Sequence, residues 1–97
     1  MPQLGRVADK IRSKNAGPFW ITIDIFCGEN FEFIRKRLDT SLICTRLQCA
    51  EDAVKRFEID NLKVIKISII RGNPQGSSKD RDMHGAQLAV LVAEMDI

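Results

Sequence analysis

Apolar and polar residues alternate most regularly between residues 18 and 27. Apolar side chains occupy every second position there: Phe19, Ile21, Ile23, Ile25 and Cys27. Thr22 and Asp24 stand between them. Because successive side chains of a strand point to opposite faces of a sheet, this pattern predicts a strand with one buried face.

A helical spacing is found on both sides of this strand. Apolar residues three and four positions apart predict helices over residues 3–13, 31–38 and 41–50. Asp39, Thr40 and Ser41 are short polar residues that can accept the free amides of the third helix, so they predict its start. Gly17 and Pro18 are expected to end the first helix before the strand begins.

The pattern in the second half of the chain predicts a β-hairpin and a loop, and it leaves the secondary structure of the C-terminal tail open. Residues 54–59 and 62–71 alternate as strands around the turn residues Asp60-Asn61, and residues 72–78 are rich in turn formers. Residues 86–97 fit a helix and a strand equally well. We expect a helical turn or two at residues 84–89, followed by a terminal strand.

These elements add up to a helix followed by the order β-α-β-β-α-β. That order predicts an α+β fold, a ferredoxin-like antiparallel sheet with an extra N-terminal helix. In such a sheet the first and third strands are antiparallel neighbours. The loop at residues 13–18 and the loop at residues 72–85 should therefore meet at one edge.

Composition narrows the class of protein. The 97 residues are the size of one domain, expected to span 1–97, and 44% hydrophobic with 29% charged residues is typical of a globular chain. A net charge of +2 gives no indication of nucleic-acid binding. With no apolar run of transmembrane length and no signal-peptide pattern, we expect a cytoplasmic protein that binds no membrane.

The cysteines do not predict a metal site. Cys27, Cys44 and Cys49 lack a paired CxxC spacing, and the chain has a single histidine. We interpret them as reduced thiols that act as small core hydrophobes, and expect neither a metal nor a cofactor.

The edge where the two loops should meet collects polar groups that suit an anion. The candidate ligand-binding residues are Arg12, Ser13, Lys14, Asn15, Gly17, Arg71, Arg81 and Gln87. Glycines allow close backbone approach, and loop amides form concavities for anions. A solvated loop whose charges pair with one another is the competing interpretation.

Catalysis at this edge would need an acid or a base. The candidates are Lys14, His84, Asp80 and Asp82, since His84 titrates near neutrality and an adjacent carboxylate could orient it. A lone histidine without a nucleophile or metal is more often structural. Trp20 and Phe26 of the first strand do not predict RNA binding, because the third strand has Val64, Lys66 and Ser68 in place of matching aromatic residues.

Four motifs together resemble one small family found in bacteria, archaea and fungi and described as a domain of unknown function. They are Ile11-Arg12-Ser13-Lys14-Asn15-Ala16-Gly17-Pro18-Phe19, Asp24-Ile25, Asp80-Arg81-Asp82 and Gly85-Ala86-Gln87. That family is similar to the small C-terminal ferredoxin-like domain of the acyclic terpene utilisation proteins. At the position of His84 the family more often has tyrosine, which weakens a catalytic role for His84.

The resemblance implies an accessory subunit or module that docks on a larger protein. The two loops, 12–18 and 71–87, would contribute to a shared site for a carboxylate or an acyl-coenzyme A. We favour a subunit of a lyase- or hydratase-type enzyme over a complete enzyme. The alternatives are a stand-alone lyase or hydratase acting on a small carboxylate, and a non-catalytic homodimer that senses a ligand or is purely structural.

Overall fold

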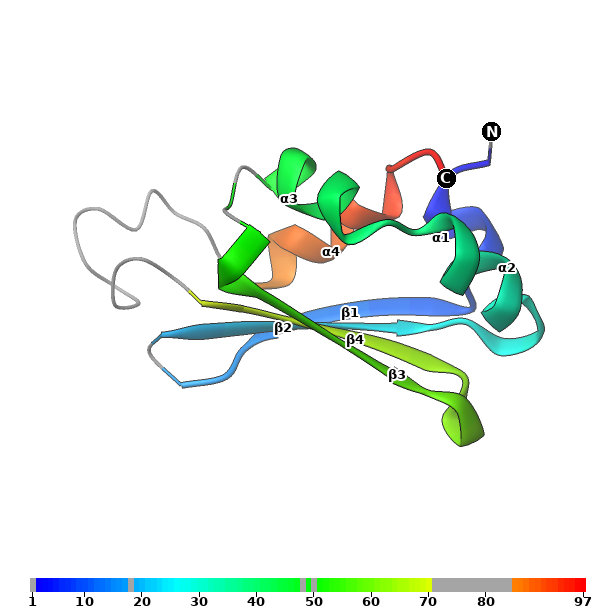
Figure 1. The fold of residues 1–97 in the computed structure, drawn as a ribbon, viewed down its shortest axis with the longest axis horizontal. Coiled ribbons are helices and arrows are strands. Elements are labelled where there is room, and N and C mark those ends of the chain that lie inside the picture. The colour runs from blue at the N-terminus through cyan, green and yellow to red at the C-terminus, as the bar shows by residue number, and fades with distance from the viewer. Residues whose placement is uncertain (1, 18, 48, 50, 71–84) are drawn as a thin grey trace.

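The computed structural model of the protein describes all residues except 1, 18, 48, 50 and 71–84. The described part folds into a sheet with strands β1 (Lys10–Asn15), β2 (Trp20–Phe26), β3 (Val54–Ile59) and β4 (Val64–Ile70). The helices are α1 (Leu4–Val7), α2 (Phe31–Arg37), α3 (Thr40–Leu47) and α4 (Gly85–Ala93). Figure 1 shows that all four lie on the same face of the sheet.

The sheet has the order β1-β2-β4-β3, and each neighbouring pair is antiparallel. The predicted α+β class is confirmed, and the arrangement is compatible with a ferredoxin-like fold. The expected pairing of the strands that contain Trp20 and Ile70 is confirmed by the β2–β4 ladder. The hairpin of β3 and β4 is also confirmed, although its connection is a 3-10 turn, Asp60–Leu62, followed by Lys63 at φ 55°.

The predicted helix over residues 3–13 is wrong beyond Val7. Helix α1 is only four residues long, and the chain then turns into the edge strand β1. Ile11 satisfied the helical spacing, but it also suits a strand, where it pairs with Ile25 of β2. A single turn of helix gains few hydrogen bonds, whereas pairing with β2 satisfies a whole strand of backbone groups.

The predicted terminal strand is also wrong, because α4 continues to Ala93. Leu88 and Val92 are each 1% exposed, so the four-residue spacing of a helix directs both into the core. The place beside β2 is occupied by β1 instead. The fourth strand therefore comes from the front of the chain, and the tail contributes to the helical layer (Figure 1).

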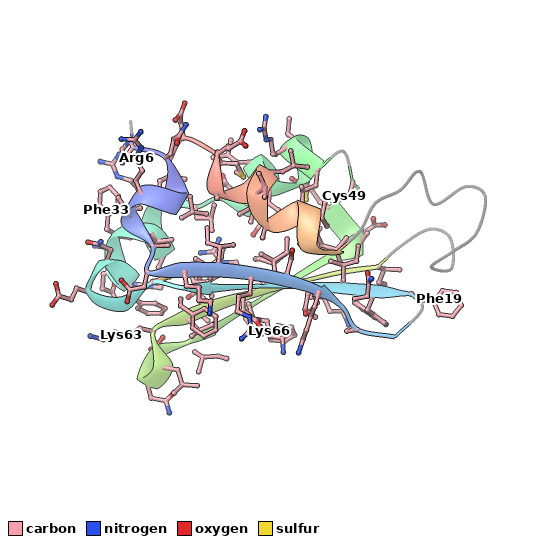
Figure 2. The ribbon with its side chains drawn as sticks, turned by 180° about the vertical axis from the view of Figure 1, so that it is seen from behind. Arg6, Phe19, Phe33, Cys49, Lys63 and Lys66 are labelled. Atoms are coloured by element: carbon pink, nitrogen blue, oxygen red, sulfur yellow. The ribbon has the colours of Figure 1, made fainter. Side chains whose placement is uncertain are left out.

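The core lies between the helices and one face of the two central strands. It includes the isoleucines of β2 and β4 that point to the helices: Ile21, Ile23, Ile25, Ile65, Ile67 and Ile69. Phe19 was expected on this buried face, but it is 49% exposed. It precedes β2 and lies at the tip of the hairpin, beyond the helices (Figure 2).

Side-chain hydrogen bonds hold the ends of the helices in place. Ser41 N donates to Asp39 Oδ1 over 3.1 Å, which confirms the predicted start of α3. Arg56 reaches from β3 and donates to the carbonyls of Arg35 and Leu38, at the end of α2. The last carbonyls of a helix lack hydrogen-bond donors within the helix, and the half-buried guanidinium of Arg56 supplies donors for two of them.

Candidate functional site

The face of the sheet that points away from the helices is the candidate site, and we call it the open face. Strand alternation and pairing assign to it the following residues: Lys10, Arg12, Lys14, Trp20, Thr22, Asp24, Phe26, Lys55, Phe57, Ile59, Val64, Lys66, Ser68 and Ile70. Figure 2 shows Lys66 extending from the sheet on the side away from the helices. No described helix covers this face.

The open face is strongly basic although the whole chain is nearly neutral. Its cations are Lys10, Arg12, Lys14, Lys55 and Lys66. They are set against one carboxylate, Asp24, which pairs in the ladder with Arg12 on β1 and Lys66 on β4. Because like charges gathered on one surface raise its potential, the open face attracts anions more strongly than the net charge of +2 suggests.

A groove of about 360 Å³ crosses the open face over β2, β4 and β3. The residues that line it are Ala16, Trp20, Thr22, Lys55, Phe57, Lys66 and Ser68. Lys55 Nζ lies 5.7 Å from the centroid of the Trp20 ring, and Phe57 is 49% exposed. The groove thus combines two aromatic surfaces with two ammonium groups.

Thr22 is the one buried polar residue in the described part of the chain. It lines the groove and is 8% exposed. Its Oγ1 has no hydrogen-bond partner among the described residues. Since buried hydroxyls are normally paired, the unpaired hydroxyl of Thr22 beside the groove is an exception in the described part of the chain.

The motif at residues 12–15 does not form the loop that its composition predicted. Within β1, Arg12 and Lys14 point to the open face, whereas Ser13 and Asn15 point to the helices. Ser13 Oγ accepts a hydrogen bond of 3.0 Å from the Ala89 amide of α4. The four predicted ligand-binding residues are therefore divided between the two faces, and Ser13 fixes a helix.

Gly17 has the left-handed conformation that was predicted, but in the turn between β1 and β2 and not at the end of a helix. Gly17 has φ 77°, a conformation that favours glycine, and Ala16 N donates to Trp20 O over 2.8 Å to close the turn. Trp20 pairs with Ile70, so the end of β4 lies beside the start of β2 as predicted.

The remaining predicted residues fall outside what can be compared. Arg71, Asp80, Arg81, Asp82 and His84 lie outside the described residues. Gln87 lies within α4. The predicted meeting of the two loops is thus supported at its base, by Trp20 and Ile70, and stays a prediction for the rest.

The cysteines are free, as predicted, and Cys27 and Cys44 are buried. Burial raises the pKa of the Cys27 thiol to about 11. Burial, and then the neighbouring Cys44, raise the pKa of Cys49 to about 11. Both thiols are protonated at neutral pH and are poor nucleophiles. Within the described residues, no cluster of three histidine, cysteine or acidic side chains could hold a metal ion.

The groove itself was not predicted from the sequence. Phe57 of β3 and Lys66 of β4 are ladder partners on the open face. The alternation of each strand was visible, but the register that joins them was not. The apolar Val54 packs against the core. Had this been recognised, strand alternation would have indicated that Lys55 and Phe57 face away from the core.

The fold and the open face define a small α+β domain whose described helices all cover one side of the sheet and whose opposite side is basic and aromatic. The family model "Domain of unknown function (DUF4387)" matches residues 4–96. The chain therefore belongs to this family. No curated protein and no solved structure matches the chain. None of the described helices is long and apolar enough to cross a membrane.

Proposed function

We propose that the protein is a small accessory subunit or module that docks on a larger cytoplasmic protein of the acyclic terpene utilisation type. Together they form a shared site for a carboxylate or an acyl-coenzyme A. The chain contributes the segments 12–18 and 71–87 and the adjoining open face. It needs no cofactor of its own and acts as part of a lyase- or hydratase-type enzyme.

The observation that carries this proposal is the one-sided cover of the sheet. A domain of this size normally buries most of its apolar surface, yet Phe57 and Ile70 remain 49% and 43% exposed on the open face. Exposed apolar side chains rimmed by charges are typical of interaction surfaces. The cations among them favour an acidic partner surface or an anion held between the two proteins.

The base of the proposed shared site is supported by the sheet. Lys14 pairs with Thr22, and Trp20 pairs with Ile70, so the cation of β1 and the end of β4 belong to the same end of the open face. The segment that follows Ile70 starts from this point. Arg71 and Arg81 belong to this segment, which lies outside the described residues.

A complete enzyme is the weaker candidate. The thiols of Cys27 and Cys49 are protonated at neutral pH, which makes them poor nucleophiles. The stand-alone lyase or hydratase would depend on Lys14 with His84, Asp80 and Asp82. A homodimer through the edge strands β1 or β3 is the other alternative.

The test is co-purification from the native cell with the tagged chain. We expect one larger protein to be retained by the wild type and lost with Lys14→Glu, because a reversed charge on the open face repels an acidic partner. Arg6→Glu is the matched control, since Arg6 lies on the helical side of the molecule (Figure 2). Equal loss with both variants, or retention of no larger protein, contradicts the proposal.

Turnover of a small carboxylate by the isolated chain would support the stand-alone enzyme instead. Lys14→Ala and His84→Ala would then abolish activity. A particle mass that corresponds to a dimer and does not change when the partner is added would support the homodimer.

A further inference from the structure

We propose that the groove formed by β2, β3 and β4 binds a flat organic anion, an aromatic ring system that carries a carboxylate or a phosphate. The inference deepens the proposed function, because the groove lies on the open face that we assign to the shared site. All of the groups that it uses come from this chain. Binding can therefore be measured without the partner.

The aromatic residues of the groove suit the flat part of such a ligand. Trp20 stands at one end of β2, and Phe57 lies on β3, with Ser68 and Lys66 of β4 between the two strands. The partly exposed indole of Trp20 offers a face for stacking on a planar ring. The ring of the ligand would take the place of the Lys55 ammonium over Trp20, an exchange of one weak contact for another.

The lysines of the groove suit the charged part. Lys55 of β3 and Lys66 of β4 line the groove. Lys14 of β1 is the ladder partner of Thr22, so it lies next to the groove on the side of β1. Asp24, the carboxylate of the open face, is not among the lining residues. An ammonium displaced from the Trp20 ring can bind a carboxylate or phosphate oxygen at the floor of the groove, where the bond is charge-assisted.

The hydroxyl of Thr22 is the observation that most directly indicates a ligand. A β-branched residue suits this central position, and valine would fill the same volume without the cost of an unpaired buried hydroxyl. The protein instead has Thr22, which lines the groove and whose Oγ1 is enclosed and unpaired. A ligand oxygen would accept the proton of this hydroxyl once the Thr22 side chain turns toward the groove.

The binding test can use the fluorescence of the chain itself. The protein has one tryptophan and no tyrosine, so Trp20 in the groove dominates the emission. We would titrate the isolated full chain with adenosine monophosphate and with 2-naphthoate, which represent a ring with a phosphate and a ring with a carboxylate. Inorganic phosphate has the charge without the ring, and adenosine has the ring without the charge.

We expect saturable quenching by at least one ring-bearing anion, and the stronger of the two identifies the phosphate or the carboxylate source. Phosphate and adenosine should bind at least about tenfold more weakly, because each lacks one of the two interactions. The inference is overturned if neither ring-bearing anion gives saturable quenching. It is equally overturned if phosphate or adenosine binds as tightly as the ring-bearing anion.

Variants locate the binding. Lys55→Gln should weaken it about tenfold, whereas Arg6→Gln, which removes the same charge from the helical side, should leave it unchanged. Equal weakening by both variants would mean that the anion responds to net charge alone, which overturns the assignment to the groove.

Thr22 has a more selective test. Thr22→Val should weaken binding about fivefold and at the same time raise the urea midpoint, because it removes an unpaired buried hydroxyl. Thr22→Ser keeps the hydroxyl and should retain binding. A valine variant that binds as tightly as the wild type, or that unfolds at a lower urea concentration, contradicts the role of Thr22.

The two proposals fail separately. If no probe binds but the larger protein still co-purifies and is lost with Lys14→Glu, the groove assignment is wrong and the proposed function stands. If a ring-bearing anion binds but no partner is retained, the groove is a ligand site of a protein that works by itself.

Discussion

The two faces of the sheet are built from the same four strands and differ in almost every property. On the helical face, Ile23 and Ile67 are fully buried among other isoleucines. On the open face, their neighbours in sequence include Thr22 and Lys66, with a basic groove between aromatic residues. Strand alternation thus separates the residues that stabilise the fold from those available for binding. Substitutions on the open face can test function with little effect on folding.

The largest expected difference is between a core isoleucine and an exposed aromatic residue. Ile23→Ala should lower the free energy of unfolding by about 2 to 5 kcal/mol, since it opens a cavity at a fully buried site. Phe57→Ala, at a site 49% exposed, should cost about 1 kcal/mol or less. Urea denaturation of both variants measures the contrast. Equal losses would mean that the open face is a second core.

The next contrast uses neighbours on β3. Arg56→Met keeps the aliphatic stem but leaves the carbonyls of Arg35 and Leu38 without their donor, so it should cost about 1 to 3 kcal/mol. Lys55→Met, on the open face, should cost below about 1 kcal/mol, the value of its exposed contact with Trp20. Thermal unfolding of the pair provides the comparison. A larger loss with Lys55→Met would contradict the assignment of the two faces.

A smaller contrast divides the motif in β1. Ser13→Ala removes the acceptor for the Ala89 amide and should cost about 1 kcal/mol, with faster amide exchange in α4. Lys14→Ala should leave stability unchanged within about 0.5 kcal/mol and weaken partner retention. Hydrogen exchange and co-purification read out the two effects. If Ser13→Ala abolished partner binding in a fully stable protein, its side chain would belong to the site.

The last contrast concerns Cys27 and can be measured only in alkali, because the stability of the fold depends on this thiol's ionisation only there. Because the folded pKa of Cys27 is raised from 9.0 to about 11, its contribution to stability is complete below pH 9 and is lost as the pH rises towards 11. The buried thiol, which donates to Ile25 O over 3.4 Å, must then ionise. Urea midpoints measured across this range should fall less steeply for Cys27→Ala. Parallel curves would contradict a buried, protonated Cys27.

Much of the fold could be predicted from single stretches of sequence. The strict alternation at residues 19–27 identified β2, and the spacing of Phe31 and Ile34 identified α2. The short polar residues from Asp39 to Ser41 marked the start of α3. These elements have strong local signals, and their local preferences agree with the fold.

The failures have a common physical cause. Residues 3–13 and 86–97 each carry a pattern that fits both a helix and a strand, so the choice depends on the rest of the molecule. The edge beside β2 can accept one strand, and β1 occupies it through the tight turn at Gly17. The tail then packs as a helix across β1, where Ser13 accepts the Ala89 amide.

The candidate site shows the same division. The left-handed conformation of Gly17 could be predicted from residue type, and the neighbourhood of Trp20 and Ile70 from the order of the elements along the chain. The groove could not be predicted in this way. It depends on the register between three strands, which brings Lys55 of β3 and Thr22 of β2 to opposite sides of Ser68.

By itself, the sequence determined which residues are apolar, where the chain turns and the α+β class, since these follow from side-chain chemistry and short-range backbone preference. Packing of the whole molecule settles which end of the chain completes the sheet and which face of the sheet the described helices cover. Competition for one strand edge and for one layer of helices is a property of the whole molecule, and no local stretch records its outcome.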